Sequence, residues 1–258
     1  MMRQVAKLAR LRRNGTGIHF EAHGQGAPIL LTHGFGATSR MWDEQIEEFT
    51  DRYQLILWDL PGHGESEAPG KTLTLASLVD DMEAILDNAD AGRAVLVGLG
   101  AGGTLGLRFW RAHPERVRGL ILIGTTPGLR SGIAREIWNG QVSALAASLE
   151  RDGLDALEGG AEVYPRLHAC PLGLASAARA LLLQRDDGTL PWLAEIDVPV
   201  LILVGSEDKP NLSAAHFMAR TIPHAREIVI PRANHAANIH KSATVNVAIR
   251  DFLGRLPP

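Results

Sequence analysis

Continuous hydrophobic runs alternate along the chain with segments that have helical spacing. Six runs are long enough for one strand each: ILLTH (29–33), LILWDL (55–60), AVLVGL (94–99), LILIGT (120–125), VLILVG (200–205) and EIVIP (227–231). Such runs are typical of strands buried on both faces of a parallel sheet. Segments between them, such as LASLVDDMEAILDNAD, predict the crossover helices that parallel strands need. The pattern therefore predicts an α/β fold with a mostly parallel, doubly wound sheet.

Two segments depart from this alternation. Near the N-terminus, Asn14-Gly15 separates LARLRR from IHFEAH, and this dipeptide is typical of a tight hairpin turn. From Gly128 to about Thr189 no strand-like run occurs, and stretches such as VSALAASLE and ASAARALLLQ have helical composition. We therefore expect a helical cap, residues 128–189, inserted into a core formed by residues 1–127 and 190–258.

Composition and charge narrow the class of protein. The chain has 258 residues, of which 45% are hydrophobic, so it can form one large core that carries an insertion. Its net charge is −3 and its Lys and Arg are scattered, which predicts no nucleic-acid partner. No apolar h-region follows the basic start MMRQVAKLARLRR, and no apolar run approaches about 20 residues, so neither a signal peptide nor a membrane span is expected. The single cysteine, Cys170, excludes an intramolecular disulfide and fits a cytoplasmic location, while a homodimer stays open.

The run AVLVGL leads directly into GLGAGG (98–103) and a helix-like segment. A sharp strand-to-helix turn flanked by glycines is the usual form of a nucleophile elbow, whose apex carries a serine, but here the apex is Gly100. The same letters satisfy G-x-G-x-x-G, the dinucleotide-binding fingerprint. That fingerprint opens its fold and needs an acidic residue after the next strand, whereas GLGAGG follows several strands and the next strand ends in LILIGTTPG. We therefore do not expect a dinucleotide site.

Three more motifs follow predicted strands. The glycines of HGFG (33–36) can turn a backbone N–H into the space above the sheet, and Asp208 in GSED and His235 in ANH lie beyond the last two strands. An isolated Asp or His in a loop is usually only solvated. The order elbow, Asp, His is more specific, because a buried Asp holds an imidazole in one tautomer and lets it act as a base.

Taken together, HGFG, DLPGHGES, GLGAGG, GSED and NH resemble the α/β-hydrolase superfamily, near its enol-lactonase-like and esterase-like members with a helical cap. The resemblance covers nearly the whole chain. It implies that His235 is the general base, that Asp208 orients it, and that the N–H groups of Phe35 and Ala101 form an oxyanion hole. It also implies an enzyme that acts on a small or medium hydrophobic ester, lactone or related carbonyl compound.

Gly100 stands where the families that this chain resembles carry serine. Glycine adopts positive φ easily, so we expect the fold to be preserved while the hydroxyl is missing. Three hypotheses stay open. In the first, the chain is a serine hydrolase whose nucleophile was substituted or lost. In the second, it is an enzyme that needs no serine, in which His235 acts on water or a C–H as in a lyase, cyclase or cofactor-free oxygenase. In the third, it is a non-catalytic ligand-binding protein. Thr104, Ser66 and Ser206 are expected to be structural.

The remaining expectations concern the pocket and its ligands. Trp138 and LLLQ (181–184) in the predicted cap are candidates to line an apolar pocket, with ordinary cap packing as the alternative. The ten histidines are dispersed, and none has a spacing such as H-E-x-x-H. The sequence therefore predicts no metal and no organic cofactor, and a small-molecule substrate as the partner.

Overall fold

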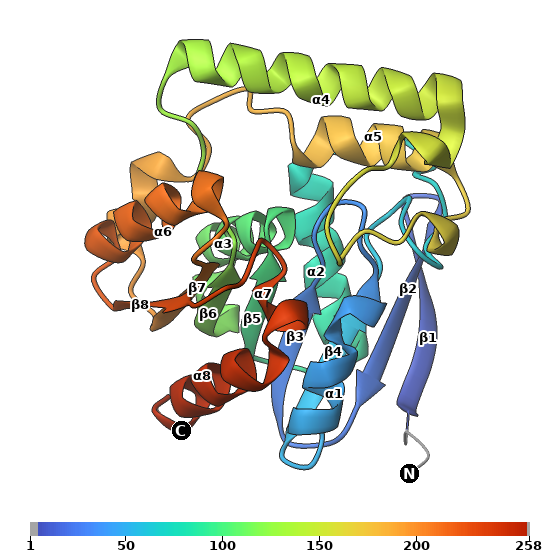
Figure 1. Ribbon diagram of the computed structural model, residues 1–258. Coiled ribbons are helices and arrows are strands. Elements are labelled where there is room, and N and C mark those ends of the chain that lie inside the picture. The colour runs from blue at the N-terminus through green and yellow to red at the C-terminus, as the bar shows by residue number, and fades with distance from the viewer. Residues whose placement is uncertain (1–4, 257–258) are drawn as a thin grey trace.

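A sheet of eight strands forms the centre of the computed structural model, which describes residues 5–256 (Figure 1). The strands are β1 (Val5–Arg13), β2 (Thr16–His23), β3 (Ala27–Thr32), β4 (Tyr53–Trp58), β5 (Ala94–Leu99), β6 (Val117–Ile123), β7 (Val200–Gly205) and β8 (Ala225–Ile230). Their order across the sheet is β1-β2-β4-β3-β5-β6-β7-β8. The pairs β1·β2 and β2·β4 are antiparallel, and all other neighbours are parallel.

Helices cover both faces of this sheet. They are α1 (Asp43–Phe49), α2 (Leu75–Asn88), α3 (Ala101–Ala112), α4 (Gly132–Asp152), α5 (Pro171–Leu181), α6 (Lys209–Thr221), α7 (Ala237–His240) and α8 (Ser242–Gly254), with 3₁₀ turns η1 (Ser39–Trp42), η2 (Pro114–Arg116), η3 (Gly153–Ala156), η4 (Pro165–Leu167) and η5 (Leu190–Glu195). The apolar sides of α1 and α8 share one hydrophobic core, and those of α2, α3 and α6 share another. Two cores on opposite faces confirm the predicted doubly wound α/β fold.

The six predicted strands are present as β3 to β8, each within a few residues of its predicted limits. The predicted hairpin turn is also present, with Asn14 and Gly15 at φ 49° and 84°. One detail is wrong: β8 is not buried on both faces, and its Val229 is 38% exposed. The reason is position, because β8 is an edge strand and its apolar run has a neighbouring strand on one side only.

The segment between β6 and β7 forms the inserted helical cap. Within it, α4 and α5 make a layer across the top of the molecule in Figure 1, where the chain contains no strand among the described residues. The two helices pack on each other through a small core of their own, formed by Val142, Ala146, Leu149, Leu157, Leu174, Ala175 and Ala178. The cap limits of 128 and 189 stay a prediction.

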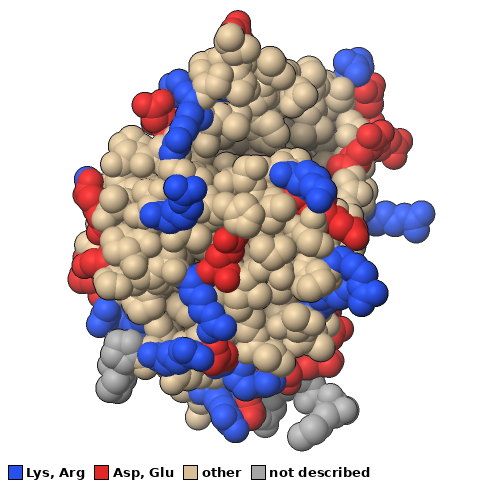
Figure 2. Space-filling model, turned by 60° about the vertical axis from the view of Figure 1, so that its left-hand side comes forward, with Lys and Arg blue, Asp and Glu red and all other residues tan. Residues whose placement is uncertain are grey.

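Charged side chains are spread over the surface. On the face in Figure 2, Lys and Arg lie among Asp and Glu and do not gather into one basic patch. Several exposed pairs are close enough to interact, as Arg179 and Glu150 are at 2.6 Å. Among residues 5–256, no helix has the length and hydrophobicity needed to span a bilayer.

Candidate active site

Gly100 lies at the sharp turn from β5 into α3. Its backbone angles are φ 52° and ψ −113°, and its N–H donates to the Ile123 carbonyl at 2.9 Å, which ties the turn to β6. A side chain with a Cβ is strained at this φ, whereas glycine is not. Two residues earlier, a Cβ on Gly98 would overlap the backbone of Gly102, so α3 can start this close to the strand only with glycine there. The glycines of GLGAGG thus serve the strand-to-helix turn itself.

His235 and Asp208 come together at the carboxyl ends of β8 and β7. His235 Nδ1 lies 3.0 Å from Asp208 Oδ2, and the Asp208 side chain is only 5% exposed. Asn211, in the first turn of α6, donates to both carboxylate oxygens at 3.0 and 2.9 Å. Because the Asp208 carboxylate accepts a hydrogen bond from Nδ1–H, the neutral imidazole carries its hydrogen on Nδ1, and its Nε2 is left as a base.

The surroundings of this pair shift both pKa values. Burial by itself lowers the pKa of His235, but the hydrogen bond and charge of Asp208, together with the charge of Glu162, outweigh burial and raise it. Burial raises the pKa of Asp208, and the hydrogen bonds from His235 and Asn211 more than reverse this, so its pKa lies below the usual range. Asp208 is therefore a carboxylate at neutral pH, and the imidazolium form of His235 is stabilised.

The free nitrogen of His235 points at the turn of Gly100. A Cβ built on Gly100 would lie 3.0 Å from His235 Nε2, closer than an ordinary van der Waals contact. Within the described part of the chain, Nε2 has no hydrogen-bond partner. The imidazole base thus faces the place where a side chain at position 100 would start.

Two backbone N–H groups lie beside the same turn. Ala101 is the first residue of α3, and Phe35 lies in the loop after β3, and both line the cavity that Gly100 and His235 line. Among residues 5–256, neither N–H has a hydrogen-bond acceptor. Unpaired N–H groups at the start of a helix and in an adjacent loop are what an oxyanion hole requires.

The loop of Phe35 is held from the cap side. The Gly36 carbonyl accepts hydrogen bonds from Tyr164 N–H at 3.2 Å and from His168 Nε2 at 2.9 Å. His168 Nδ1 in turn accepts from Gly64 N–H at 3.1 Å. These bonds connect the cap segment to the two loops that follow β3 and β4.

Three buried histidine rings pack together beneath this loop. They are His33, His63 and His168, named here the histidine cluster, with ring centroids 5.1 Å apart for His33 and His63 and 5.5 Å apart for His63 and His168. Burial lowers the pKa of all three, that of His33 to about 4. His33 Nε2 accepts from Leu60 N–H at 2.9 Å, so protonating it removes the acceptor of a buried N–H. The histidine cluster is therefore neutral and structural.

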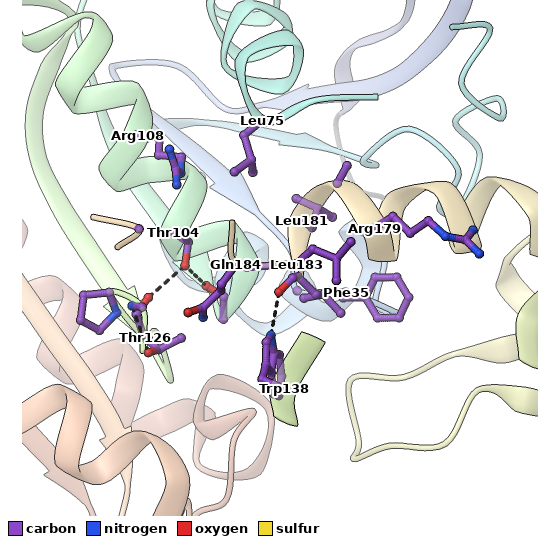
Figure 3. A pocket seen from close by; sticks show the side chains of 18 of the residues that line it. Phe35, Leu75, Thr104, Arg108, Thr126, Trp138, Arg179, Leu181, Leu183 and Gln184 are labelled. Atoms are coloured by element: carbon purple, nitrogen blue, oxygen red, sulfur yellow. Dashed lines mark hydrogen bonds between the residues drawn. The ribbon is translucent and has the colours of Figure 1, made fainter. Parts of the chain in front are cut away.

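A cavity of about 360 Å³ lies between the cap and the sheet (Figure 3). Gly100, Phe35, Ala101 and His235 line it from the sheet side, and Trp138 and residues 181–184 line it from the cap. The Trp138 ring is held in place because Nε1 donates to the Leu182 carbonyl at 2.6 Å. Most of the side chains along the cavity are apolar or uncharged, which suits a hydrophobic ligand.

The hydroxyl groups that could replace a serine at position 100 form hydrogen bonds with other partners. Ser66 Oγ donates to the Asp59 carbonyl at 2.6 Å, and Ser206 Oγ accepts from Arg232 N–H at 2.9 Å, and neither serine lines the cavity. Thr104 does line it, but its Oγ1 donates to the Thr126 carbonyl at 3.1 Å. The described residues contain no group of three His, Cys, Asp or Glu side chains that could hold a metal ion.

Sequence reasoning missed several polar residues at this site, including Asn211, Glu162 and Arg108. Asn211 supports Asp208, and Glu162 and Arg108 line the cavity. Asn211 follows Asp208 by three residues at the start of a helix, a spacing at which side chains meet, so a signal was present. Glu162 lies in an irregular cap segment, where hydrophobic periodicity carries no information on position.

Comparison with known proteins places the chain in a family. Residues 27–154 match the α/β-hydrolase fold model. A thermophilic esterase from Thermogutta terrifontis is 30% identical, with a TM-score of 0.83 over 96% of this chain and 98% of that one. The enol-lactonase from Burkholderia xenovorans LB400 is 25% identical, with a TM-score of 0.83 over 96% of this chain and 100% of that one. An (E)-2-((N-methylformamido)methylene)succinate hydrolase from Acinetobacter baylyi is 29% identical over 98% of this chain and 100% of its own length.

The motifs, the fold and these relatives agree. The chain belongs to the α/β-hydrolase superfamily. Its esterase-like and lactonase-like relatives match over nearly their full length, so the superfamily core and the cap are both included in the likeness.

Proposed function

We propose that this chain is a hydrolase-fold enzyme for a small or medium hydrophobic ester, lactone or related carbonyl compound, with machinery that is complete except for a side-chain nucleophile. The proposal depends on one observation: His235 Nε2 points at Gly100, while Nδ1 of the same ring is hydrogen-bonded to Asp208. A protein that only binds ligands has no need of this oriented base. The esterase, lactonase and hydrolase names of the relatives support the substrate class.

In the proposed mechanism, water replaces the missing serine hydroxyl. His235 Nε2 removes a proton from a water molecule next to Gly100, and the water oxygen bonds to the carbonyl carbon. The N–H groups of Phe35 and Ala101 stabilise the negative charge that develops on the carbonyl oxygen. The tetrahedral intermediate then collapses, the bond to the alcohol oxygen breaks, and the alkoxide takes the proton from His235. The products are a carboxylic acid and an alcohol.

Removal of an acidic C–H proton by the same base is a second candidate, because His235 Nε2 is unpartnered among the described residues and needs no nucleophile for that reaction. A lyase or cyclase of this kind would leave esters intact. Hydrolysis and proton exchange into a ketone or ester substrate therefore distinguish the two candidates.

The test uses hydrolysis of p-nitrophenyl butyrate by four proteins: the chain as it stands, His235→Ala, Gly100→Ser, and Gly100→Ser with His235→Ala. We expect slow hydrolysis by the chain, a loss of about 10²–10⁴-fold in His235→Ala, and faster hydrolysis with an acyl-enzyme in Gly100→Ser. His240→Ala is the matched control, since His240 is exposed and five residues away. Activity in Gly100→Ser alone would assign the chain to a hydrolase that lost its nucleophile. Inactivity of all four proteins toward esters and lactones would overturn the proposal.

A further inference from the structure

One carboxylate in the cavity has no role in the mechanism above. Glu162 lines the cavity together with Gly100, Phe35 and His235, although it is only 7% exposed. Its Oε2 is fully buried and, among the described residues, has no hydrogen-bond partner. A buried carboxylate oxygen without a donor is costly, and such a group in a folded protein calls for an explanation.

The position of Glu162 is fixed by its neighbours. It belongs to the segment between η3 and η4, and two residues later Tyr164 N–H donates to the Gly36 carbonyl. Val163 Cγ1 lies 3.6 Å from the place where a Cβ on Gly36 would stand, so the segment packs directly on the loop of Phe35. The carboxylate is thus carried by the cap but held against the loop that supplies an oxyanion N–H. Its charge also contributes to the raised pKa of His235, which agrees with a place near the base.

We propose that Glu162 is a substrate-binding residue, whose carboxylate accepts a hydrogen bond from a hydroxyl or ammonium group that the substrate carries close to its reacting carbonyl. This proposal rests on the proposed function, because it names a property of the same substrate. The Glu162 carboxylate, which has no hydrogen-bond donor among the described residues, supplies an acceptor that the protein leaves unused, in a cavity whose other walls are mostly apolar. A ligand that brings a donor satisfies the carboxylate, whereas a purely hydrocarbon chain leaves it buried and unpaired. The substrate is therefore a carbonyl compound with a donor on its chain.

The experiment measures binding, so that it does not depend on turnover. The probes are methyl 3-hydroxybutanoate, methyl 3-aminobutanoate, methyl 3-methoxybutanoate and methyl butanoate, and their Kd values are obtained by ligand-observed NMR for the chain as it stands. The hydroxyl and the ammonium donate a hydrogen bond, whereas the methoxy group has similar size and cannot. We expect at least one donor probe to bind about tenfold or more tightly than the methoxy probe.

Two variants test whether Glu162 causes the preference for probes that donate a hydrogen bond. Glu162→Gln keeps the size and removes the charge, and it should reduce the preference for the donor probe to less than about threefold, with the larger loss for the ammonium probe. Glu162→Asp keeps the charge and should retain part of the preference. Glu158→Gln, which changes an exposed carboxylate in the same segment, should leave it unchanged. Thermal unfolding of each variant reports whether it is folded.

Several results would overturn the proposal: equal binding of donor and methoxy probes, no detectable binding of either donor probe, or a preference that survives in folded Glu162→Gln. These results are independent of ester hydrolysis. If all four proteins of the hydrolysis assay are inactive toward esters and lactones while the Glu162-dependent preference holds, the hydrolase proposal fails and the binding proposal stands. If Gly100→Ser hydrolyses esters without any preference for donors, the reverse is true.

Discussion

Substituting Gly100 by alanine tests whether the turn from β5 into α3 requires glycine. Gly100→Ala adds one methyl group at φ 52° and brings it to 3.0 Å from His235 Nε2. A non-glycine residue at such a backbone position costs about 1–3 kcal/mol, and the imidazole must also move by a few tenths of an ångström. For a chain of this size, Tm falls by about 2–4 °C for each kcal/mol, so we expect Gly100→Ala to lower it by several degrees.

The matched control is Gly140→Ala. Gly140 is exposed within α4, and a Cβ built there meets nothing within 4 Å. Alanine is the better helix former, so this variant should gain about 0.5–1 kcal/mol and raise Tm. Both variants are compared with the unchanged chain by thermal and urea unfolding. A Gly100→Ala protein as stable as the unchanged chain would refute the argument that the turn requires glycine for an unstrained backbone.

Three further expectations concern pH and the cap. In Gly100→Ser, kcat/KM for ester hydrolysis should fall as the pH drops through the pKa of His235, which is raised above its ordinary value of about 6.5. Asp208→Asn in the same background should move the midpoint of this profile to lower pH and should lower kcat. A profile that Asp208→Asn leaves unaltered would contradict the pairing of His235 with Asp208. Because the pKa values of the histidine cluster are lowered, the unfolded chain binds protons at mildly acidic pH that the folded chain does not. The free energy of unfolding, measured by urea titration, should therefore decrease as the pH drops below about 6.5. A free energy of unfolding that stays constant between about pH 6.5 and 4 would contradict neutral rings. Leu174→Ala in the buried cap core should cost about 2–5 kcal/mol of local stability and speed amide hydrogen exchange in α4 and α5. Leu172→Ala, at an exposed position, should change the exchange rates little. Equal exchange protection in the two variants would refute a separate cap core.

The arrangement of the sheet could be predicted from the sequence because parallel strands have a strong signal. Runs without polar alternation locate the strands, and the carboxyl ends of parallel strands lie at one edge of the sheet. Residues that follow different strands, such as Gly100, Asp208 and His235, therefore meet although they are far apart in the chain. The exposure of β8 escaped prediction, because an apolar run does not reveal whether its strand lies at an edge.

The cap contribution could not be predicted to the same degree. Helical composition indicates α4 and α5, but the segment that carries Glu162 has no regular spacing, and only tertiary contacts bring it to the loop of Phe35. For the same reason the unused acceptor on Glu162 is visible only in three dimensions. Trp138 was a candidate from its residue type alone, and its hydrogen bond to Leu182 comes from the packing of two cap helices.

The relaxed turn at Gly100 has an evolutionary consequence. Two serine codons, AGC and AGT, become glycine codons by a change of one base, so the step between the two residues is short in either direction. Glycine at this turn makes the chain more stable than serine would, and natural proteins tolerate further mutations only while enough stability is left. A chain with glycine at this position therefore has more stability in reserve for destabilising substitutions elsewhere than the same chain with serine. A change of Gly100 to serine would remove that margin, so gaining a side-chain nucleophile at this turn costs stability as well as one base change.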